Sequence, residues 1–452
     1  MNLEETSLRL LKDALKILDE GFTSLPAISA QVAHDPRLAA VMNEVAAKMQ
    51  DNYPYFHPLY AGQMLKPPHP IARAAYALAT WINPNNHALD GGRASSAMEK
   101  EAVAQIAAMF GWKEFLGHLC GGGTMANLEA LWVAGQLKPG KKILASEQAH
   151  YTHHRISSVL QLPFAGVASD NRGRMDVKDL EKMLEAGDVG CVVATVGTTG
   201  TGSVDPLPEI LKLRDRYEFR VHVDSAYGGY FTLVGNVDAE TRASYDLIGQ
   251  ADSIVIDPHK HGLQPYGCGC VLFRDPSVGA IYKHESPYTY FTSSDLHLGE
   301  ISLECSRPGA SAVALWATQR LLPLVRGREF AQMLEASRGA AVRFARRLAD
   351  DGRWLVPSAP ELDIVVWAPR AASASEISKS SQRIFDAAAK QSLHLALIRL
   401  PVRFFAGHQS EFQSDCETVL CLRSVLMKPE HLDWLDRIWA ILSRVADEVL
   451  TR

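Results

Sequence analysis

The chain has 452 residues, of which 47% are hydrophobic and 21% are charged, and this composition is typical of globular rather than disordered or fibrous proteins. Its length suits a large domain accompanied by a smaller one. The formal net charge of −5 argues against nucleic acid or an acidic membrane as the main partner.

The N-terminus and the cysteines bear on location. Residues 1–20 carry charges throughout, unlike a secretion signal or a transit peptide. No apolar run reaches the ~18 residues that span a bilayer. The seven cysteines are scattered without a C-x-x-C pair. We therefore expect reduced thiols, no metal site, no membrane contact and a cytoplasmic protein.

The first part of the chain reads as helices separated by a proline-rich loop. Residues 3–22 place leucines at helical spacing, which predicts a helix whose apolar stripe docks on the body of the protein or on a partner subunit. Aromatic and proline residues fill the stretch 53–70, which either covers the core or lines a pocket. Two more helices are predicted, at 71–82 and 95–110.

The middle of the chain alternates short apolar strands with helices. Strands are predicted at 142–145, 190–196, 219–223, 253–256 and 270–273, and helices at 125–137, from 151, and at 207–217. Unbroken apolar strands followed by helices indicate an α/β fold with a parallel sheet covered on both faces. Polar and glycine residues follow several strand ends, where open α/β sheets place their ligands.

The last part of the chain begins with helices at 311–325 and 329–348, followed by an αβ section from 364 to 450. We therefore predict an N-terminal helical segment (1–50), a large domain (51–325) and a small C-terminal domain (326–452).

A glycine-rich turn before a helix predicts an anion site. The segment 121–124 reads Gly-Gly-Gly-Thr and opens the helix 125–137, so backbone N–H groups and the positive helix end face one point. The pattern is neither G-x-G-x-x-G nor a Walker motif, so a nucleotide is not implied. Glycine turns before helices are common, and this signal is weak by itself.

Three side chains that follow strands in a fixed order strengthen the prediction of an anion-binding cofactor site. Asp224 follows one strand and suits a charge-assisted hydrogen bond to a pyridinium N–H. Lys260 follows the next strand, where an amine is poised to form a Schiff base. His150 lies upstream after a third strand. Each has a bland alternative, a turn aspartate or a solvated lysine, but their order together favours a cofactor site.

The motifs GGGTMANLEAL, SEQAHYTHH, ATVGTTGTGSVDPL, HVDSAYGG and DPHKHG resemble those of the group II pyridoxal-phosphate-dependent amino acid decarboxylases. The likeness extends from about residue 50 to the stretch 422–427. It implies fold type I, the aspartate-aminotransferase-like fold, with pyridoxal 5′-phosphate as cofactor. It also implies a homodimer whose active sites lie at the subunit interface.

The resemblance assigns roles to individual residues. Lys260 resembles the Schiff-base lysine, and Asp224 the partner of the pyridine nitrogen. Ala226 would pack beneath the ring and His150 would stack on its other face. Further cofactor contacts fall to Gly123, Thr124, Met125, Thr199, Asp257 and His259. Arg423 matches an arginine that some members use to hold the substrate carboxylate; a structurally paired or exposed strand arginine is the alternative.

Asp257 departs from the family pattern. Members that act on aromatic amino acids or glutamate usually carry asparagine at this position. The extra carboxylate would be solvated or would face an arginine or a histidine.

The implied reaction is decarboxylation of an L-amino acid to its amine, through the Schiff base on Lys260 and a quinonoid intermediate. Tyr288 and Tyr290 are candidate proton donors to Cα, and His150 is another. Which amino acid is the substrate does not follow from the sequence.

Three alternatives stay open. One is a carbon–carbon lyase of the sphingosine-phosphate-lyase type, acting on a phosphorylated amino alcohol, and another is oxidative decarboxylation–deamination to an aldehyde. The third, a cofactor-free interaction protein on the same fold, is disfavoured because Lys260, Asp224 and His150 are all present.

Overall fold

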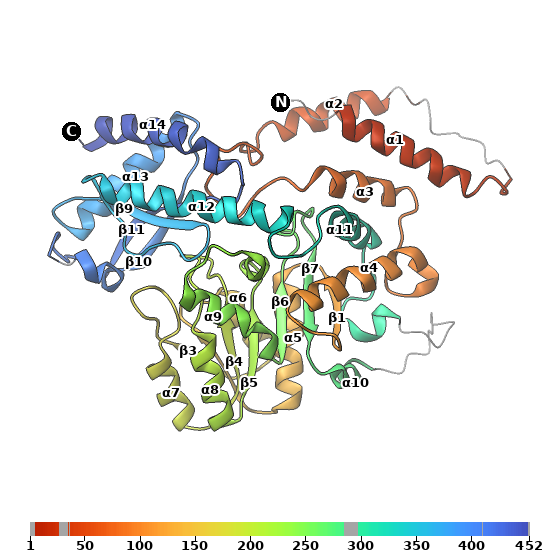
Figure 1. Cartoon of the computed structure of the whole chain (residues 1–452), viewed down its shortest axis with the longest axis horizontal. Coiled ribbons are helices and arrows are strands. Elements are labelled where there is room, and N and C mark those ends of the chain that lie inside the picture. The colour runs from red at the N-terminus through yellow and green to blue at the C-terminus, as the bar shows by residue number, and fades with distance from the viewer. Residues whose placement is uncertain (1–4, 27–34, 36, 284–296, 409, 451–452) are drawn as a thin grey trace.

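The computed structural model of the chain describes residues 5–26, 35, 37–283, 297–408 and 410–450 (Figure 1). The helices are α1 Glu5–Glu20, α2 Arg37–Met49, α3 Pro70–Thr80, α4 Leu89–Met109, α5 Gly123–Leu137, α6 Thr152–Val159, α7 Val177–Glu185, α8 Leu207–Tyr217, α9 Ala239–Asp246, α10 Gly279–Tyr282, α11 Gly309–Leu321, α12 Glu329–Asp350, α13 Ala374–Lys390 and α14 His431–Leu450. The strands are β1 Leu116–Cys120, β2 Lys142–Ser146, β3 Phe164–Val167, β4 Val189–Thr195, β5 Arg220–Asp224, β6 Ser253–Ile256, β7 Gly269–Phe273, β8 Trp354–Leu355, β9 Ile364–Pro369, β10 Ala396–Pro401 and β11 Thr418–Val425. Among the described residues, no helix combines the length and apolar character needed to cross a bilayer.

The large sheet has the order β1-β7-β6-β5-β4-β2-β3. Neighbouring strands run parallel from β6 to β3, whereas β7 runs antiparallel to both β1 and β6. The α/β fold predicted from the sequence is therefore confirmed, and β7 is its one antiparallel strand within the described residues.

Both faces of the large sheet are covered, because successive side chains of a strand point to opposite sides. On β4, Val192 and Ala194 belong to the same apolar cluster as the core side of α8, whereas Cys191 and Val193 pack with α5 and α6. This explains why the strand reads as an unbroken apolar run. The helices leave the strand ends uncovered, and the polar residues gather there.

The second sheet is antiparallel, with the order β10-β11-β9-β8. Its helices α12, α13 and α14 enclose a separate apolar cluster that includes Trp354 and Trp367. Figure 1 shows this sheet beside the upper end of the large one. The domain boundaries at 50/51 and 325/326 stay a prediction.

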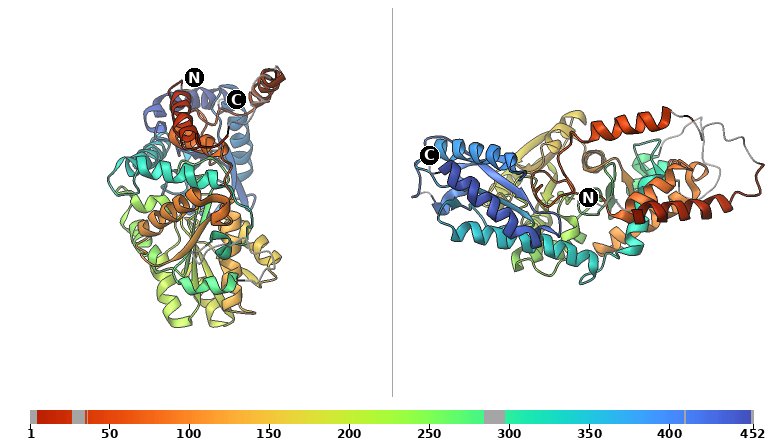
Figure 2. Two further views of the ribbon diagram at one scale, coloured as in Figure 1. Left: turned by 90° about the vertical axis from the view of Figure 1, so that its right-hand side faces the viewer. Right: turned by 90° about the horizontal axis from the view of Figure 1, so that it is seen from above.

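The N-terminal helices lie on the outside of the molecule (Figure 2). Helix α1 packs on α3, as the docking prediction allowed, but Leu8 and Ile17 remain 67% and 70% exposed. Helix α2 has no buried residue, and the sequence analysis did not predict it.

Candidate active site

A cavity of about 520 Å³ opens at the carboxyl ends of the large sheet's strands, in the size range of small-molecule sites. Segments that follow β1, β2, β4, β5 and β6 supply most of its lining. All ten residues predicted to contact the cofactor lie on it: Gly123, Thr124, Met125, His150, Thr199, Asp224, Ala226, Asp257, His259 and Lys260. The sequence analysis did not single out Asn127, Leu128, Thr152, Thr195, Gly197, Tyr227 and Glu304, which also line it.

The glycine turn between β1 and α5 forms a cup that side chains would fill. Gly122 has φ 147°, in the region that favours glycine, and a Cβ there would lie 3.2 Å from the ring of His259. A Cβ on Gly123 would lie 2.7 Å from a carboxylate oxygen of Asp257. The backbone N–H of Gly121 donates to Glu304 Oε2 at 3.1 Å, so this turn already binds a carboxylate.

A chain of side-chain hydrogen bonds fixes the start of α5. Asn127 donates from Nδ2 to the carbonyl of Gly123 (2.8 Å), and its Oδ1 lies 2.8 Å from His222 Nε2. His222 Nδ1 in turn lies 2.9 Å from Ser253 Oγ. Burial lowers the pKa of His222 to about 3, so the ring is neutral. Because Asn127 Oδ1 accepts, the proton of His222 lies on Nε2. Through His222 and Ser253, β5 and β6 together hold the start of α5 in place.

Asp224 ends β5 with both carboxylate oxygens engaged. Oδ1 accepts from the backbone N–H of Ala226 at 3.1 Å, and Oδ2 lies 2.8 Å from Nε2 of the buried His153. Burial raises the pKa of Asp224, but the hydrogen bond and charge of His153 outweigh it and hold the pKa below its ordinary value. Asp224 is therefore an ionised carboxylate on the cavity wall.

His153 is the main functional candidate that the sequence analysis missed. It is buried on α6, three residues after His150, which lies in the loop before that helix. The repeated histidines of the SEQAHYTHH motif were the available signal. Nothing in the sequence indicated that the second one would reach Asp224.

Lys260 lies just beyond β6 with its amine beside Asp257. Nζ is 3.1 Å from Asp257 Oδ2, and the side chains are 20% and 2% exposed. His259 Nε2 lies 3.5 Å from the same oxygen. The alternative of a solvated Asp257 is therefore wrong: the carboxylate is buried and faces the lysine first and the histidine second.

His150 lines the cavity from the loop before α6. The backbone N–H of Thr152 donates to its Nδ1 at 3.3 Å, and Thr152 Oγ1 lies 2.8 Å from the same nitrogen. Since Nδ1 accepts, the neutral ring carries its proton on Nε2. Burial lowers the pKa of His150 despite the nearby charge of Asp224, so the imidazole is largely neutral near pH 7.

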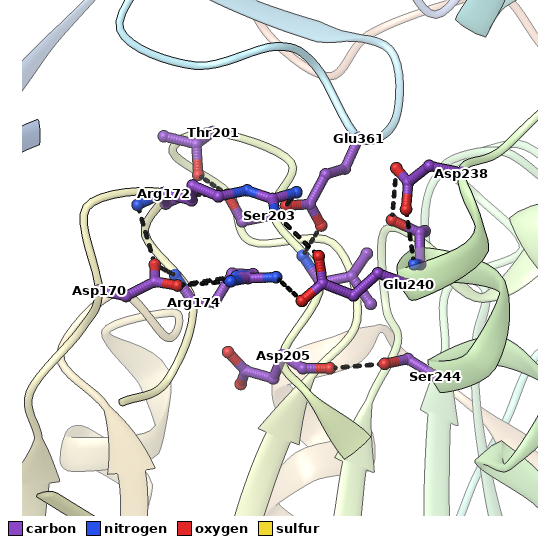
Figure 3. A network of polar contacts seen from close by, with 12 residues as sticks. Asp170, Arg172, Arg174, Thr201, Ser203, Asp205, Asp238, Glu240, Ser244 and Glu361 are labelled. Atoms are coloured by element: carbon purple, nitrogen blue, oxygen red, sulfur yellow. Dashed lines mark hydrogen bonds and ion pairs between the residues drawn. The ribbon is translucent and has the colours of Figure 1, made fainter. Parts of the chain in front are cut away.

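A network of ion pairs and hydrogen bonds supports the loop that carries Thr199 (Figure 3). Asp205 accepts the backbone N–H groups of Met175 and Thr195, both at 2.7 Å. Glu361, from the small-sheet side, accepts the N–H of Val204 at 2.8 Å and pairs with Arg172 at 2.7 Å. Burial raises the pKa values of Asp205 and Glu361 to about 7.

Arg423 is the predicted residue that the structure does not bring onto the cavity lining. It lies in the middle of β11, is 5% exposed, and its Nε and Nη2 find no hydrogen-bond partner among the described residues. Burial lowers its pKa, while the nearby Tyr227, Asp363 and Tyr60 raise it. Of these three, Tyr227 lines the cavity, and its hydroxyl donates to Asp363 Oδ1 at 2.6 Å. The alternative of an exposed arginine is wrong.

Two predicted residues cannot be placed. Tyr288 and Tyr290 lie outside the described residues. In the described part of the chain, no three or more His, Cys, Asp and Glu side chains cluster in a way that would hold a metal ion.

The arrangement fits a cofactor with a phosphate, a protonated ring nitrogen and an aldehyde. The glycine cup suits the phosphate because two of its positions have no room for a Cβ. Ionised Asp224 suits the ring nitrogen, and the amine of Lys260 suits the aldehyde. These are the groups of pyridoxal phosphate.

Comparison with known proteins gives the same result. A family described as pyridoxal-dependent decarboxylase conserved domain matches residues 132–369. An L-tyrosine decarboxylase from Enterococcus faecium is 28% identical over 432 residues, covering 71% of this chain and 70% of its own. A probable L-tyrosine/L-aspartate decarboxylase from Methanothermobacter thermautotrophicus is 29% identical over 310 residues, covering 68% and 82%. A crystal structure of Oryza sativa TDC with PLP and tryptamine superposes with a TM-score of 0.76 at 17% identity, covering 98% of this chain and 99% of that one.

Proposed function

Because this chain belongs to the family of pyridoxal-dependent decarboxylases, we propose that it removes the α-carboxylate of an L-amino acid as carbon dioxide and releases the amine. The observation that supports this most is the convergence of Lys260, Asp224 and the α5 cup on one cavity. Bound pyridoxal phosphate supplies the electron sink for the electron pair that the departing carboxylate leaves at Cα.

We propose the following roles, which the position of each residue on the cavity lining supports. Lys260 Nζ holds the cofactor aldehyde covalently between turnovers. Asp224 accepts a hydrogen bond from the ring N–H and keeps that proton in place, because His153 keeps the carboxylate ionised. Backbone N–H groups of Gly123, Thr124 and Met125 bind the phosphate at the start of α5.

The remaining cavity residues position the ring. Ala226 and His150 would hold the ring between them, and Thr199 and His259 would contact the cofactor. The lowered pKa of His150 favours stacking over proton donation near pH 7. Tyr290 or Tyr288 therefore remains our proposed donor of the proton to Cα.

We propose L-aspartate and L-tyrosine as the first substrates to test, because curated relatives are named for these two amino acids. The experiment is a screen of the twenty amino acids and diaminobutyrate for carbon dioxide release. Oxygen uptake with ammonia and aldehyde products would replace the proposal with oxidative decarboxylation–deamination. Aldehyde release from a phosphorylated amino alcohol would replace it with carbon–carbon lysis.

The absorption spectrum of the purified protein tests whether pyridoxal phosphate is bound through Lys260. The purified protein should absorb at the wavelength of a protonated imine of pyridoxal phosphate, and Lys260→Ala should lose that band while retaining its circular dichroism spectrum. A protein that is colourless and does not gain the band with added pyridoxal phosphate contradicts the proposal.

We further propose a cytoplasmic homodimer with active sites at the subunit interface. The seven cysteines form no disulfide, which supports a reducing compartment. Exposed apolar side chains support the dimer, with Ile17 on α1 at 70% and Met42 and Met49 on α2 at 62% and 64%. Light scattering should give twice the chain mass; a monomer that retains full activity contradicts this part.

A further inference from the structure

The carboxylate of Asp257 is held unlike the other buried carboxylates of the site. Asp224 and Asp205 each accept two hydrogen bonds, which tie them to the fold. No backbone N–H or hydroxyl group of the described residues donates to Asp257. Its Oδ1 is buried and has no hydrogen-bond partner there, and its Oδ2 faces Lys260 Nζ at 3.1 Å.

A structural role explains this arrangement poorly. Burying a carboxylate without donors costs free energy, and the carboxylate crowds Gly123, where it leaves no room for a Cβ. The positive end of α5 offsets part of that cost. The shorter of its two ion-pair distances in the described residues, 3.1 Å, is to Lys260 Nζ, the nitrogen proposed to bond to the cofactor.

Several other titratable groups interact electrostatically with Asp257, and burial disfavours the charged form of each. Burial lowers the pKa values of His259, on the same loop, and of His150, before α6. Burial raises those of the thiols and phenols whose electrostatic interactions include Asp257, namely Cys120 at the end of β1, Cys268 and Cys270 at β7, Tyr230 after β5 and Tyr266. Lys260 Nζ, at 3.1 Å from Oδ2, lies nearer to this carboxylate than His259 Nε2 does at 3.5 Å.

We propose that Asp257 is the proton acceptor for Lys260 when the lysine bonds to the cofactor, an inference that rests on the proposed function. The carboxylate takes one proton from the ammonium, giving a neutral amine and a carboxylic acid. The amine nitrogen attacks the aldehyde carbon, a C=N bond forms, and the aldehyde oxygen leaves as water. The proton held by Asp257 returns to the departing oxygen or to the new C=N nitrogen, so no further reactant is needed.

The test measures how fast pyridoxal phosphate attaches to the apoprotein. Stopped-flow absorbance follows the C=N band, and borohydride reduction followed by mass spectrometry identifies Lys260 as the attachment site. Asp257→Asn keeps the shape and removes the charge, whereas Asp246→Asn removes the same charge at the surface, where Asp246 pairs with Arg326. Circular dichroism checks that both variants are folded.

We expect Asp257→Asn to attach the cofactor about 10²-fold more slowly at pH 7, the usual size of a general-base contribution. Its rate should rise about tenfold per pH unit from pH 6 to 8, because solvent must now remove the proton. The wild type and Asp246→Asn should share a shallow pH profile. Asp257→Ala should be slow as well, and formate, a small carboxylate, should raise its rate.

Two results overturn the inference. An attachment rate and pH profile unchanged in Asp257→Asn would show that the carboxylate takes no proton. Faster attachment would show that it merely holds the lysine as an ammonium. Pyridoxine 5′-phosphate, which lacks the aldehyde, separates affinity from attachment, and its dissociation constant should change by less than about threefold. If the wild type itself attaches no pyridoxal phosphate, the proposed function fails instead.

Discussion

His153 allows a quantitative test of how the site keeps Asp224 ionised. Its Nε2 lies 2.8 Å from Asp224 Oδ2, and the two side chains are 0% and 6% exposed. His153→Leu removes the donor while filling much of the same volume. A hydrogen bond to a charged group contributes about 1.5–3 kcal/mol, which corresponds to roughly a 10- to 150-fold change in an equilibrium constant.

Without the hydrogen bond and charge of His153, the pKa of Asp224 rises, because burial is then opposed only by the weaker interactions with His222 and Lys260. The carboxylate then binds the protonated ring nitrogen less strongly. We therefore expect the dissociation constant for pyridoxal phosphate to increase roughly 10- to 150-fold in His153→Leu. The fraction of bound cofactor with a protonated ring nitrogen should fall as well, which shifts its absorption band.

The assay is a spectroscopic titration of apoprotein with the cofactor. His153→Gln retains an N–H donor and should recover most of the affinity, whereas His154→Leu alters the exposed neighbouring residue and should change nothing. Wild-type affinity in His153→Leu would refute the reasoning. So would a folded His153→Gln that binds as weakly as the leucine variant, because the hydrogen bond would then not be what matters.

The other predictions concern the pH dependence of stability, the glycine cup and Arg423. Burial raises the folded-state pKa values of Asp205 and Glu361 to about 7, so the folded chain retains protons that the unfolded chain releases, and the free energy of unfolding falls from about pH 4 to pH 7. The melting temperature of Glu361→Gln should therefore fall less between pH 5.5 and pH 7.5 than that of the wild type. An equal fall in both proteins would contradict the raised pKa of Glu361. Gly123→Ala should weaken cofactor binding at least about tenfold, whereas Gly166→Ala, whose Cβ meets nothing within 4 Å, should not; equal titrations would remove the steric argument. The family resemblance implies that Arg423 holds the substrate carboxylate, so Arg423→Ala should raise the apparent KM for the amino acid about tenfold with a smaller change in kcat; an unchanged KM would agree instead with its position off the cavity lining.

The fold could be predicted where the hydrophobic pattern of a segment matches its burial in the folded protein. The strands β4, β5 and β6 are apolar runs that end in functional residues, and their positions were correct to within about a residue. The strands β1, β3, β8 and β10 were not predicted: β1 and β10 carry a polar residue within the run, and β3 and β8 are only four and two residues long. Within β1, for example, His118 is buried only because Glu129 pairs with it from α5 at 2.9 Å.

The candidate site shows the same limit. Residues placed by strand ends and a glycine turn were found in advance, because backbone topology alone brings strand ends together. Contacts made by side chains across elements were not, such as His153 to Asp224, or Lys260 to Asp257 rather than to solvent. The reversed direction of β7 was not predicted either, although the short connection 257–268, which has no helix, favours an antiparallel pair.

The antiparallel strand β7 also orders events during synthesis. It pairs with β1 from Leu116↔Phe273 to Cys120↔Gly269. Strand β1, which leads into the glycine turn of the cup, therefore has no pairing partner among the described strands until β7 is synthesised about 150 residues later. At ribosomal speeds of about 5–20 residues per second, that delay is on the order of 10 s. The central strands are complete before then. The nascent chain can therefore build most of its parallel sheet, yet it acquires a cofactor-binding edge only after Phe273 has left the ribosome.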